Sequence, residues 1–284
     1  TAIAMTFEIF NHWMVDFRQR LGWLGILAVV AVAVIVTVSL LAPWLAPKSH
    51  LYGELGDQFA PPSINYLLGA DENGRDILSR LIFGSRTSLL GPLAVILIAL
   101  IVGVPLAIAS AWKGGLSDVI IGRFLDLIFC FPPVLTAALI VTLLNHRGLV
   151  PAVVAVGIAY IPWTARITRS AALRERFLPY ITACEVQGFS VFSICVRHML
   201  PNLSRLIVAQ STIAFGYALV DIAALSFLGL AIQSPNPDWG LMVGSTGSIA
   251  RGEYGQAIFA GILIIITVAA FSIIGNRISE DESN

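Results

Sequence analysis

Long apolar runs without a charged side chain constrain this chain more than any other feature of its sequence. Residues 21–47 and 87–112 contain no Asp, Glu, Lys or Arg. Each run exceeds the roughly 20 apolar residues that an α-helix needs to cross about 30 Å of hydrocarbon. Hydrophobic residues make up 57% of the 284 residues and charged residues only 12%. This composition excludes an ordinary soluble domain and predicts an all-α protein that crosses the membrane several times.

Further apolar windows bring the predicted number of transmembrane helices to six. The third window starts near residue 119 and continues to residue 146, with two prolines inside it, and the others cover 148–165, 206–230 and 254–276. Residues 21–284 are therefore predicted to form a single transmembrane domain. Residues 1–20, with aromatic and polar residues interleaved, are predicted to be an interfacial lead-in.

Arginines are concentrated in the loop at residues 166–201 more than in any other loop. The positive-inside rule places such a loop, and with six spans both termini, in the cytoplasm. The middle of the loop is nevertheless apolar, with Phe177, Ile181 and Val186 among its residues, which is typical of a surface covered by a partner. Pro179 suits the first turn of a helix and Gly188 suits the left-handed residue after its end. We expect a short helix at residues 179–187.

The same loop resembles the "EAA" loop of ABC importer permeases. That motif reads Glu-Ala-Ala, three residues, Gly, nine residues, a variable position, one more residue, then Leu-Pro. The matching positions here are Tyr180, Thr182, Ala183, Cys184, Gly188, His198, Leu200, Pro201 and Asn202. The chain departs from the motif at two positions, since Thr182 stands where the family has glutamate and Cys184 where it has the second alanine. Thr182 lacks the carboxylate and so cannot make the same contacts as the family's glutamate. Glu185 is a candidate to replace it.

In that family the loop carries the coupling helix, which lies in a cleft of the ATP-hydrolysing subunit. The resemblance implies that the docking residues are Pro179, Tyr180, Ile181, Thr182, Ala183, Cys184, Glu185 and Gly188, and that the loop ends at His198, Leu200, Pro201 and Asn202. The alternative is a plain interfacial helix on lipid headgroups, because arginines plus aromatics are also typical of such helices.

Two more segments resemble the dipeptide/oligopeptide branch of these permeases, in particular the shorter, C-type chain of the heteromeric pair. They are YLLGADENGRDILSRLIFGSRTSL before the second span and RFLDLIFCFPP in the third. Residues 76–83 place Ile77 and Leu81 on one helix face and Ser79 and Arg80 on the other, which predicts an outer amphipathic helix. The resemblance implies a type I ABC importer permease fold in a bacterial inner membrane. It also implies a second homologous permease chain, two ABC ATPase subunits, and an extracytoplasmic solute-binding protein, in addition to membrane lipid.

Asp221 is the most costly residue of the predicted spans, since a carboxylate at the centre of a membrane helix costs about 3 kcal/mol on insertion. Asp221 and Ser226 are the candidate residues of a translocation path, where a carboxylate would meet the amine of a peptide. The alternative for Asp221 is a structural hydrogen bond with a neighbouring helix. Asp126 lies three residues after Arg123, which predicts an ion pair within one helix.

The outer loop before the last span contains Pro235, Pro237, Asp238, Trp239 and Gly240. We expect a rigid turn there with Trp239 as an interfacial aromatic, either gating the pore or anchoring the loop. His198 is more simply explained by packing or capping within its loop than by proton transfer.

Other classes of protein fit the sequence less well. The only lysines, Lys48 and Lys113, do not belong to a G-x-x-x-x-G-K-S/T phosphate loop, so ATP and Mg²⁺ are expected on partner subunits and no cofactor on this chain. We find no catalytic motif, no metal-ligand spacing and no basic surface typical of nucleic-acid binding. Three cysteines predict free thiols. Peptides are the expected cargo; nickel complexes or other small solutes are an alternative, and an ion-coupled secondary transporter is a more distant one.

Overall fold

The computed structural model describes residues 22–143 and 145–280. The predicted lead-in at residues 1–20 lies outside these ranges. The regular elements of the described part are the following helices: Gly22–Leu40, α2 Ala42–Leu45, the 3-10 helix η1 Leu55–Asp57, α3 Ile77–Lys113, α4 Gly115–Phe129, α5 Pro133–Leu143, α6 Leu149–Arg176, α7 Pro179–Val186, α8 Val191–Ile194, the π-helix η2 Cys195–Met199, α9 Leu200–Phe227, α10 Trp239–Val243, α11 Thr246–Ala250 and α12 Gly255–Glu280.

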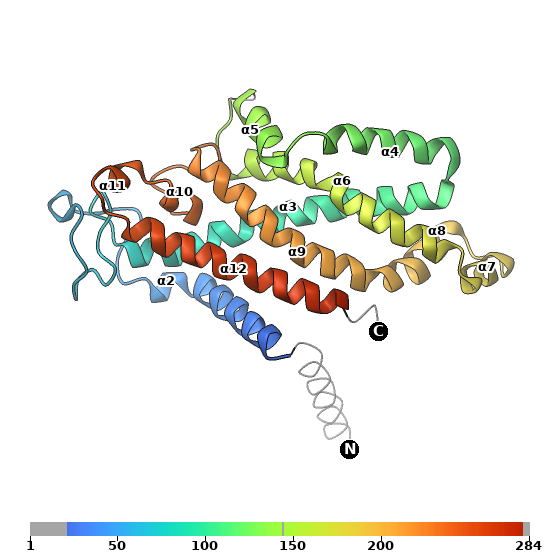
Figure 1. Cartoon of the computed structure of the whole chain (residues 1–284), viewed down its shortest axis with the longest axis horizontal. Coiled ribbons are helices and arrows are strands. Elements are labelled where there is room, and N and C mark those ends of the chain that lie inside the picture. Colours follow the sequence, from blue (N-terminus) through green and yellow to red (C-terminus); the bar gives the residue numbers. More distant parts are fainter. Residues whose placement is uncertain (1–21, 144, 281–284) are drawn as a thin grey trace, which may run out of the picture.

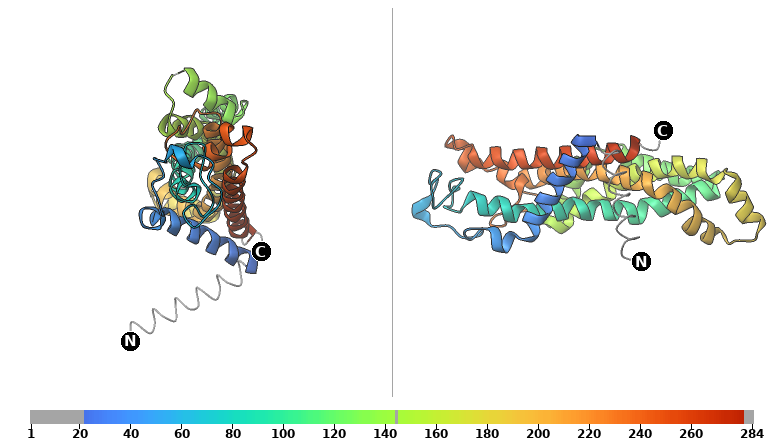
Figure 2. Two further views of the ribbon diagram at one scale, coloured as in Figure 1. Left: turned by 90° about the vertical axis from the view of Figure 1, so that its left-hand side faces the viewer. Right: turned by 90° about the horizontal axis from the view of Figure 1, so that it is seen from below.

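Four long helices, α3, α6, α9 and α12, lie side by side along the molecule (Figure 1). The helix Gly22–Leu40 runs obliquely across one side of this bundle (Figure 2). Small residues allow the long helices to approach closely. At Gly275 of α12, a Cβ atom would lie 2.5 Å from the Cγ1 of Ile213 on α9, so a larger residue there would push the two helices apart.

Among the described residues, five helices are long and apolar enough to cross a membrane, and the pair α4–α5 makes a sixth passage if it is counted as one span. The described part is therefore that of a multi-pass membrane protein, as the sequence predicts. The predicted third span is not one straight helix, because α4 and α5 meet at an angle of 81°. Pro132 and Pro133 explain the break, since proline lacks the N–H that would continue the helix and also restricts the residue before it.

The predicted outer amphipathic helix is present but is not separate. Residues 77–83 form the first turns of α3, which continues without interruption into the second span. The Asp76 carboxylate caps the helix, accepting a hydrogen bond of 2.8 Å from the backbone N–H of Ser79. The face expected to meet solvent is buried, with Ser79 and Arg80 almost fully covered. Arg80 donates 3.0 Å hydrogen bonds to the carbonyl oxygens of His50 and Pro235, so the neighbouring loops cover it.

Trp239 does not anchor the chain at the membrane interface as predicted. Its side chain is 1% exposed, and its indole N–H donates a 3.0 Å hydrogen bond to the carbonyl oxygen of Leu81 on α3. The Ser88 hydroxyl donates to the Asp238 carboxylate at 2.8 Å and accepts from the Trp239 backbone N–H at 3.1 Å. Next to them, a Cβ at Gly240 would lie 2.3 Å from the Ala223 carbonyl oxygen. The outer loop around Trp239 is therefore packed against both α3 and α9.

Candidate coupling loop and translocation pocket

Helix α7 projects at one end of the bundle, which we call the α7 end, opposite the end that carries α10 and α11 (Figure 1). The helix begins at Pro179, in the first turn as predicted. It ends in a Schellman motif, in which the N–H of Gly188 bonds to the Glu185 carbonyl and that of Phe189 to the Cys184 carbonyl, at 3.0 and 3.1 Å. Gly188 has a φ of +80°, a conformation that glycine adopts without strain.

The two faces of α7 have different environments. Tyr180, Ile181 and Cys184 pack against a buried cluster at the α7 end, made of Ala111, Ala171, Ala172, Ile194, Met199 and Leu203. Ile181 is only 1% exposed. The opposite face is open to the surroundings and consists of Pro179, Thr182, Ala183 and Val186. Spacings of three and four residues place these side chains on one helix face. Of the eight predicted docking residues, Tyr180, Ile181 and Cys184 therefore serve mainly to hold the helix in place.

A hydrogen-bonded cluster closes the base of the loop. The Tyr180 hydroxyl donates to the Glu175 carboxylate, and the Asn202 side-chain amide donates to the same carboxylate at 2.8 Å and to the Tyr180 oxygen at 3.0 Å. Burial, and secondly the bond to Glu175, raise the pKa of Tyr180 to about 12, so the phenol keeps its proton. Glu175 belongs to α6 and Asn202 to α9, so the three residues join both long helices to α7.

The end of the loop, predicted at His198, Leu200, Pro201 and Asn202, is helical. Residues Cys195–Met199 form a π-helix that leads directly into α9, and Pro201 occupies the first turn of α9. The His198 ring packs edge-on against the Phe189 ring, with 5.9 Å between the centroids and 76° between the planes. This contact agrees with the packing explanation of His198.

Large apolar side chains around α7 remain exposed. Phe177 is 80%, Val186 84% and Phe192 77% exposed. Together with Phe189 and Val191 they form the exposed apolar surface of the loop. The sequence indicates Phe177, Val186 and Phe189 as members of such a surface, whereas Phe192 and Val191 are recognised only from the structure.

A pocket of about 520 Å³ lies between α6, α9 and the break between α4 and α5. Its charged residue is Asp221, whose carboxylate accepts a hydrogen bond of 2.7 Å from the Tyr160 hydroxyl. The two residues are 61 positions apart in the chain, and nothing in the sequence pairs them. Aromatic rings of Phe129, Phe131, Tyr160, Trp163 and Tyr217 line the pocket.

Ser226 does not line this pocket. Its side chain is fully buried near the end of α9, and its oxygen accepts a long hydrogen bond of 3.5 Å from the backbone N–H of Ile232. The structure thus separates the two residues proposed for the translocation path and gives Ser226 a contact with the following loop.

Helix α4 is tied to α6 by two ion pairs. Asp126 pairs with Arg166 at 2.5 Å, not with Arg123 as the sequence spacing predicts, and Asp118 pairs with Arg169 at 2.5 Å. These contacts join residues 40 and 51 positions apart. An ion pair between helices has replaced the expected pair within one helix.

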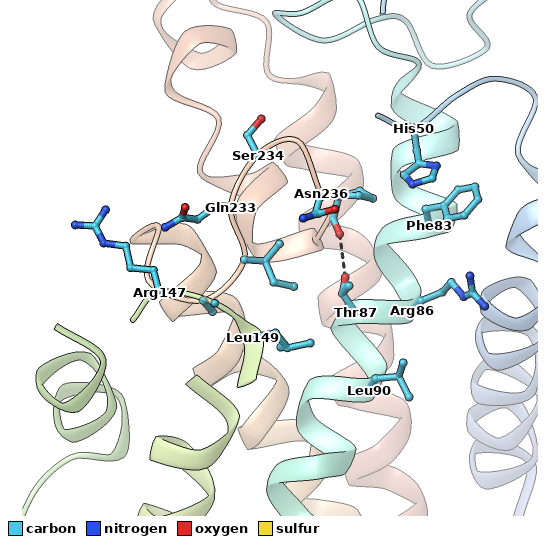
Figure 3. Close-up of a pocket in the computed structure, with 14 residues that line it drawn as sticks. His50, Phe83, Arg86, Thr87, Leu90, Arg147, Leu149, Gln233, Ser234 and Asn236 are labelled. Atoms are coloured by element: carbon cyan, nitrogen blue, oxygen red, sulfur yellow. Dashed lines mark hydrogen bonds between the residues drawn. The ribbon is translucent and has the colours of Figure 1, made fainter. Parts of the chain in front are cut away.

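A second pocket, of about 810 Å³, opens at the end opposite α7 (Figure 3). His50, Arg86 and Arg147 are its basic lining residues, and no Asp or Glu of the described part of the chain lines it. The Thr87 hydroxyl donates a 2.9 Å hydrogen bond to the Pro237 carbonyl across the pocket (Figure 3). The His50 ring stacks on Phe83 at 3.6 Å. Burial, followed by the charges of Arg80 and Arg86, lowers the pKa of His50 below its usual 6.5.

Comparison with known proteins gives one family. Residues 103–280 match the model of the "Binding-protein-dependent transport system inner membrane component". The chain is 33% identical to the di/tripeptide transport system permease protein DppC of Pseudomonas aeruginosa, over 93% of this chain and 88% of that protein. It is also 33% identical to the glutathione transport system permease protein GsiD of Pectobacterium atrosepticum, over 95% and 89% of the two chains. The chain belongs to the family of binding-protein-dependent transport system inner membrane components.

Proposed function

We propose that the chain is one of two pore-forming permease subunits of an ATP-driven peptide importer, with both termini in the cytoplasm. The observation that carries this proposal is the open face of α7. A short helix held from behind by a buried cluster, with Val186 and Phe177 exposed beside it, suits insertion into a groove of another protein. The interfacial-helix alternative explains the aromatic residues but gives no role to the fixed position of α7.

The charge distribution supports the orientation. Arg174 and Arg197 are exposed in the α7 loop, and basic residues flanking spans favour the cytoplasmic side. The opposite end mixes basic with acidic residues, as in the buried pair of Arg75 and Asp71 at 2.7 Å. The α7 end is therefore assigned to the cytoplasm, where ATPase subunits would meet it.

The ATPase subunits and the solute-binding protein are inferred from the family and from the absence of a phosphate-loop motif in this sequence. Its sequence contains no phosphate-loop pattern around Lys48 or Lys113, so ATP and Mg²⁺ belong to two separate ATPase subunits. A solute-binding protein would approach the opposite end. Large exposed apolar side chains on α4, among them Leu116, Phe124 and Leu127, would face lipid or the second permease chain. Closure of the ATPases on α7 would drive alternating access.

Peptides are the proposed cargo because the relatives named above are permeases for di/tripeptides and glutathione. A further relative, 32% identical over 90% of this chain, is the probable D,D-dipeptide transport system permease protein DdpC of Escherichia coli. No described group of three or more His, Cys, Asp or Glu side chains could hold a metal ion, and none of these names specifies nickel.

The test is to purify the tagged chain from its native membrane in mild detergent, identify every co-purifying protein, and reconstitute the complex in liposomes. We expect a second permease and P-loop ATPases, and ATP-dependent uptake of a radiolabelled dipeptide when the solute-binding protein is added. Recovery of the chain alone would argue against the docking role of α7. A complete complex that takes up Ni²⁺ but no peptide would contradict the cargo.

A further inference from the structure

The pocket that contains Asp221 has no counter-charge of its own. Asp221 makes no salt bridge with any described residue, and no Lys, Arg or His lines the pocket. The acidic residues of α4 are different, because Asp126 and Asp118 pair with Arg166 and Arg169. Acidic side chains inside a membrane protein face a partner charge or a water-filled cavity. The partner of Asp221 is therefore expected to come from outside the chain.

The walls of the pocket are suited to a cation. Trp163 and Tyr217 lie with ring centroids 6.3 Å apart at an angle of 60°, and Phe131 and Tyr160 add two more rings. Aromatic faces within about 6 Å attract ammonium and guanidinium groups. Beside the pocket this already occurs within the chain, since the Arg166 guanidinium lies 4.2 Å from the Phe129 ring centroid.

The geometry points to a binding site for the ammonium group of a transported peptide, formed by the Asp221 carboxylate and the rings of Tyr160, Trp163 and Tyr217. This inference rests on the proposed function and specifies where the permease contacts its cargo. The Tyr160 hydroxyl, 2.7 Å from the carboxylate, orients it, and the other carboxylate oxygen accepts no hydrogen bond from the described residues. A bare metal ion fits poorly, because Ca²⁺ takes six to eight oxygen ligands and Mg²⁺ an octahedron.

The position of the pocket connects binding to the broken helix. Pro132 and Pro133, at the break between α4 and α5, line the same pocket as Asp221. In secondary transporters, discontinuous transmembrane helices commonly form the substrate site. A pocket of about 520 Å³ is also within the usual range for small ligands. A change in the α4–α5 angle would alter the pocket directly.

A native thiol allows the site to be tested apart from transport. Cys130 is exposed and lines the pocket, whereas Cys184 and Cys195 lie at the α7 end and are partly buried. In the purified complex, without solute-binding protein, the rate of Cys130 alkylation by a small maleimide would be followed by mass spectrometry. We expect dialanine to slow this rate, and N-acetyl-dialanine, which has no ammonium group, to leave it unchanged.

Asp221→Asn should shift the dialanine concentration needed for protection at least tenfold upward, while the unprotected alkylation rate stays the same. Asp126→Asn removes a different carboxylate, already paired with Arg166, and should keep normal protection. If Asp221→Asn fails to assemble, Tyr217→Leu, at a half-exposed ring, should weaken protection several-fold. Equal protection by both peptides, or protection unaffected by Asp221→Asn, would overturn the site while leaving ATP-dependent peptide uptake intact. Absence of that uptake in liposomes would instead refute the proposed function.

Discussion

Asn202 donates a hydrogen bond of 2.8 Å to the Glu175 carboxylate, 27 residues earlier in the chain. The contact joins the first turn of α9 to the last turn of α6, and Tyr180 bonds to both residues. The same three side chains therefore connect α7 to two long helices. The exposed face of α7 is the surface proposed to contact the partner, and this partly exposed hydrogen-bonded cluster holds the helix in position.

Asn202→Ala should loosen the loop without unfolding the bundle. The loss leaves Glu175 and Tyr180 without their amide donor; because Asn202 is exposed, water offsets part of the loss, which should be about 1 kcal/mol. We expect hydrogen exchange in residues 179–199 to accelerate several-fold, and exchange in α12 to stay unchanged. Ser204→Ala is the matched control, because its hydroxyl bonds only within the same turn of α9, to Pro201 at 2.6 Å. Equal acceleration in both variants would contradict this role of Asn202.

The two faces of α7 should respond differently to a charge. Val186→Asp places a carboxylate on the exposed face and should prevent ATPase subunits from co-purifying, while the thermal unfolding of the isolated permease stays normal. Ile181→Asp buries the charge in the cluster and should lower the unfolding temperature, because an unpaired buried carboxylate is costly. Normal ATPase recovery with Val186→Asp would show that the open face of α7 is not the docking surface.

Gly188→Val should uncouple ATP hydrolysis from peptide uptake. A Cβ atom at this position would meet nothing within 4 Å, so the effect comes from the backbone, where a β-branched residue at φ +80° costs about 1–2 kcal/mol. Uptake per ATP hydrolysed should fall several-fold in proteoliposomes. Gly188→Asn is the control, since asparagine tolerates the left-handed conformation, and its coupling should stay close to that of the wild type.

His50 should make the end opposite α7 sensitive to acid. Its pKa in the folded protein is below 6.5, because burial and two arginines disfavour the charged ring. As the pH falls, the His50 ring binds a proton at a higher pH in the unfolded chain than in the folded protein. The contribution of neutral His50 to the stability of the fold is therefore fully present above pH 6.5 and is lost as the pH falls through the lowered pKa. His50→Phe keeps the stacking on Phe83 and should unfold at a higher temperature than the wild type at pH 5 but not at pH 7.5.

The control for this comparison is His146→Phe, at an exposed position, which should show no such dependence on pH. Parallel curves for the wild type and His50→Phe between pH 7.5 and pH 5 would rule out His50 as the cause.

Some features of the site could be predicted from the sequence, and others could not. The start of α7 at Pro179 and its end before Gly188 are confirmed, because both depend on backbone preferences of single residues. The predicted pair of Arg123 and Asp126 is wrong, because Arg166 of another helix lies closer to the carboxylate. Trp239 as an interfacial aromatic is also wrong, since α3 supplies a hydrogen-bond acceptor in the interior.

The sequence by itself determined the properties that depend on short segments: membrane-crossing helices from apolar length, and a basic loop with a short capped helix. Only the tertiary structure decided which side chains meet. The contact between Tyr160 and Asp221, the base formed by Glu175, Tyr180 and Asn202, and the free face of α7 all depend on how α6 and α9 pack. Helix propensity and hydropathy act over a few turns, whereas the distance between residues 61 positions apart is set by the packing of whole helices.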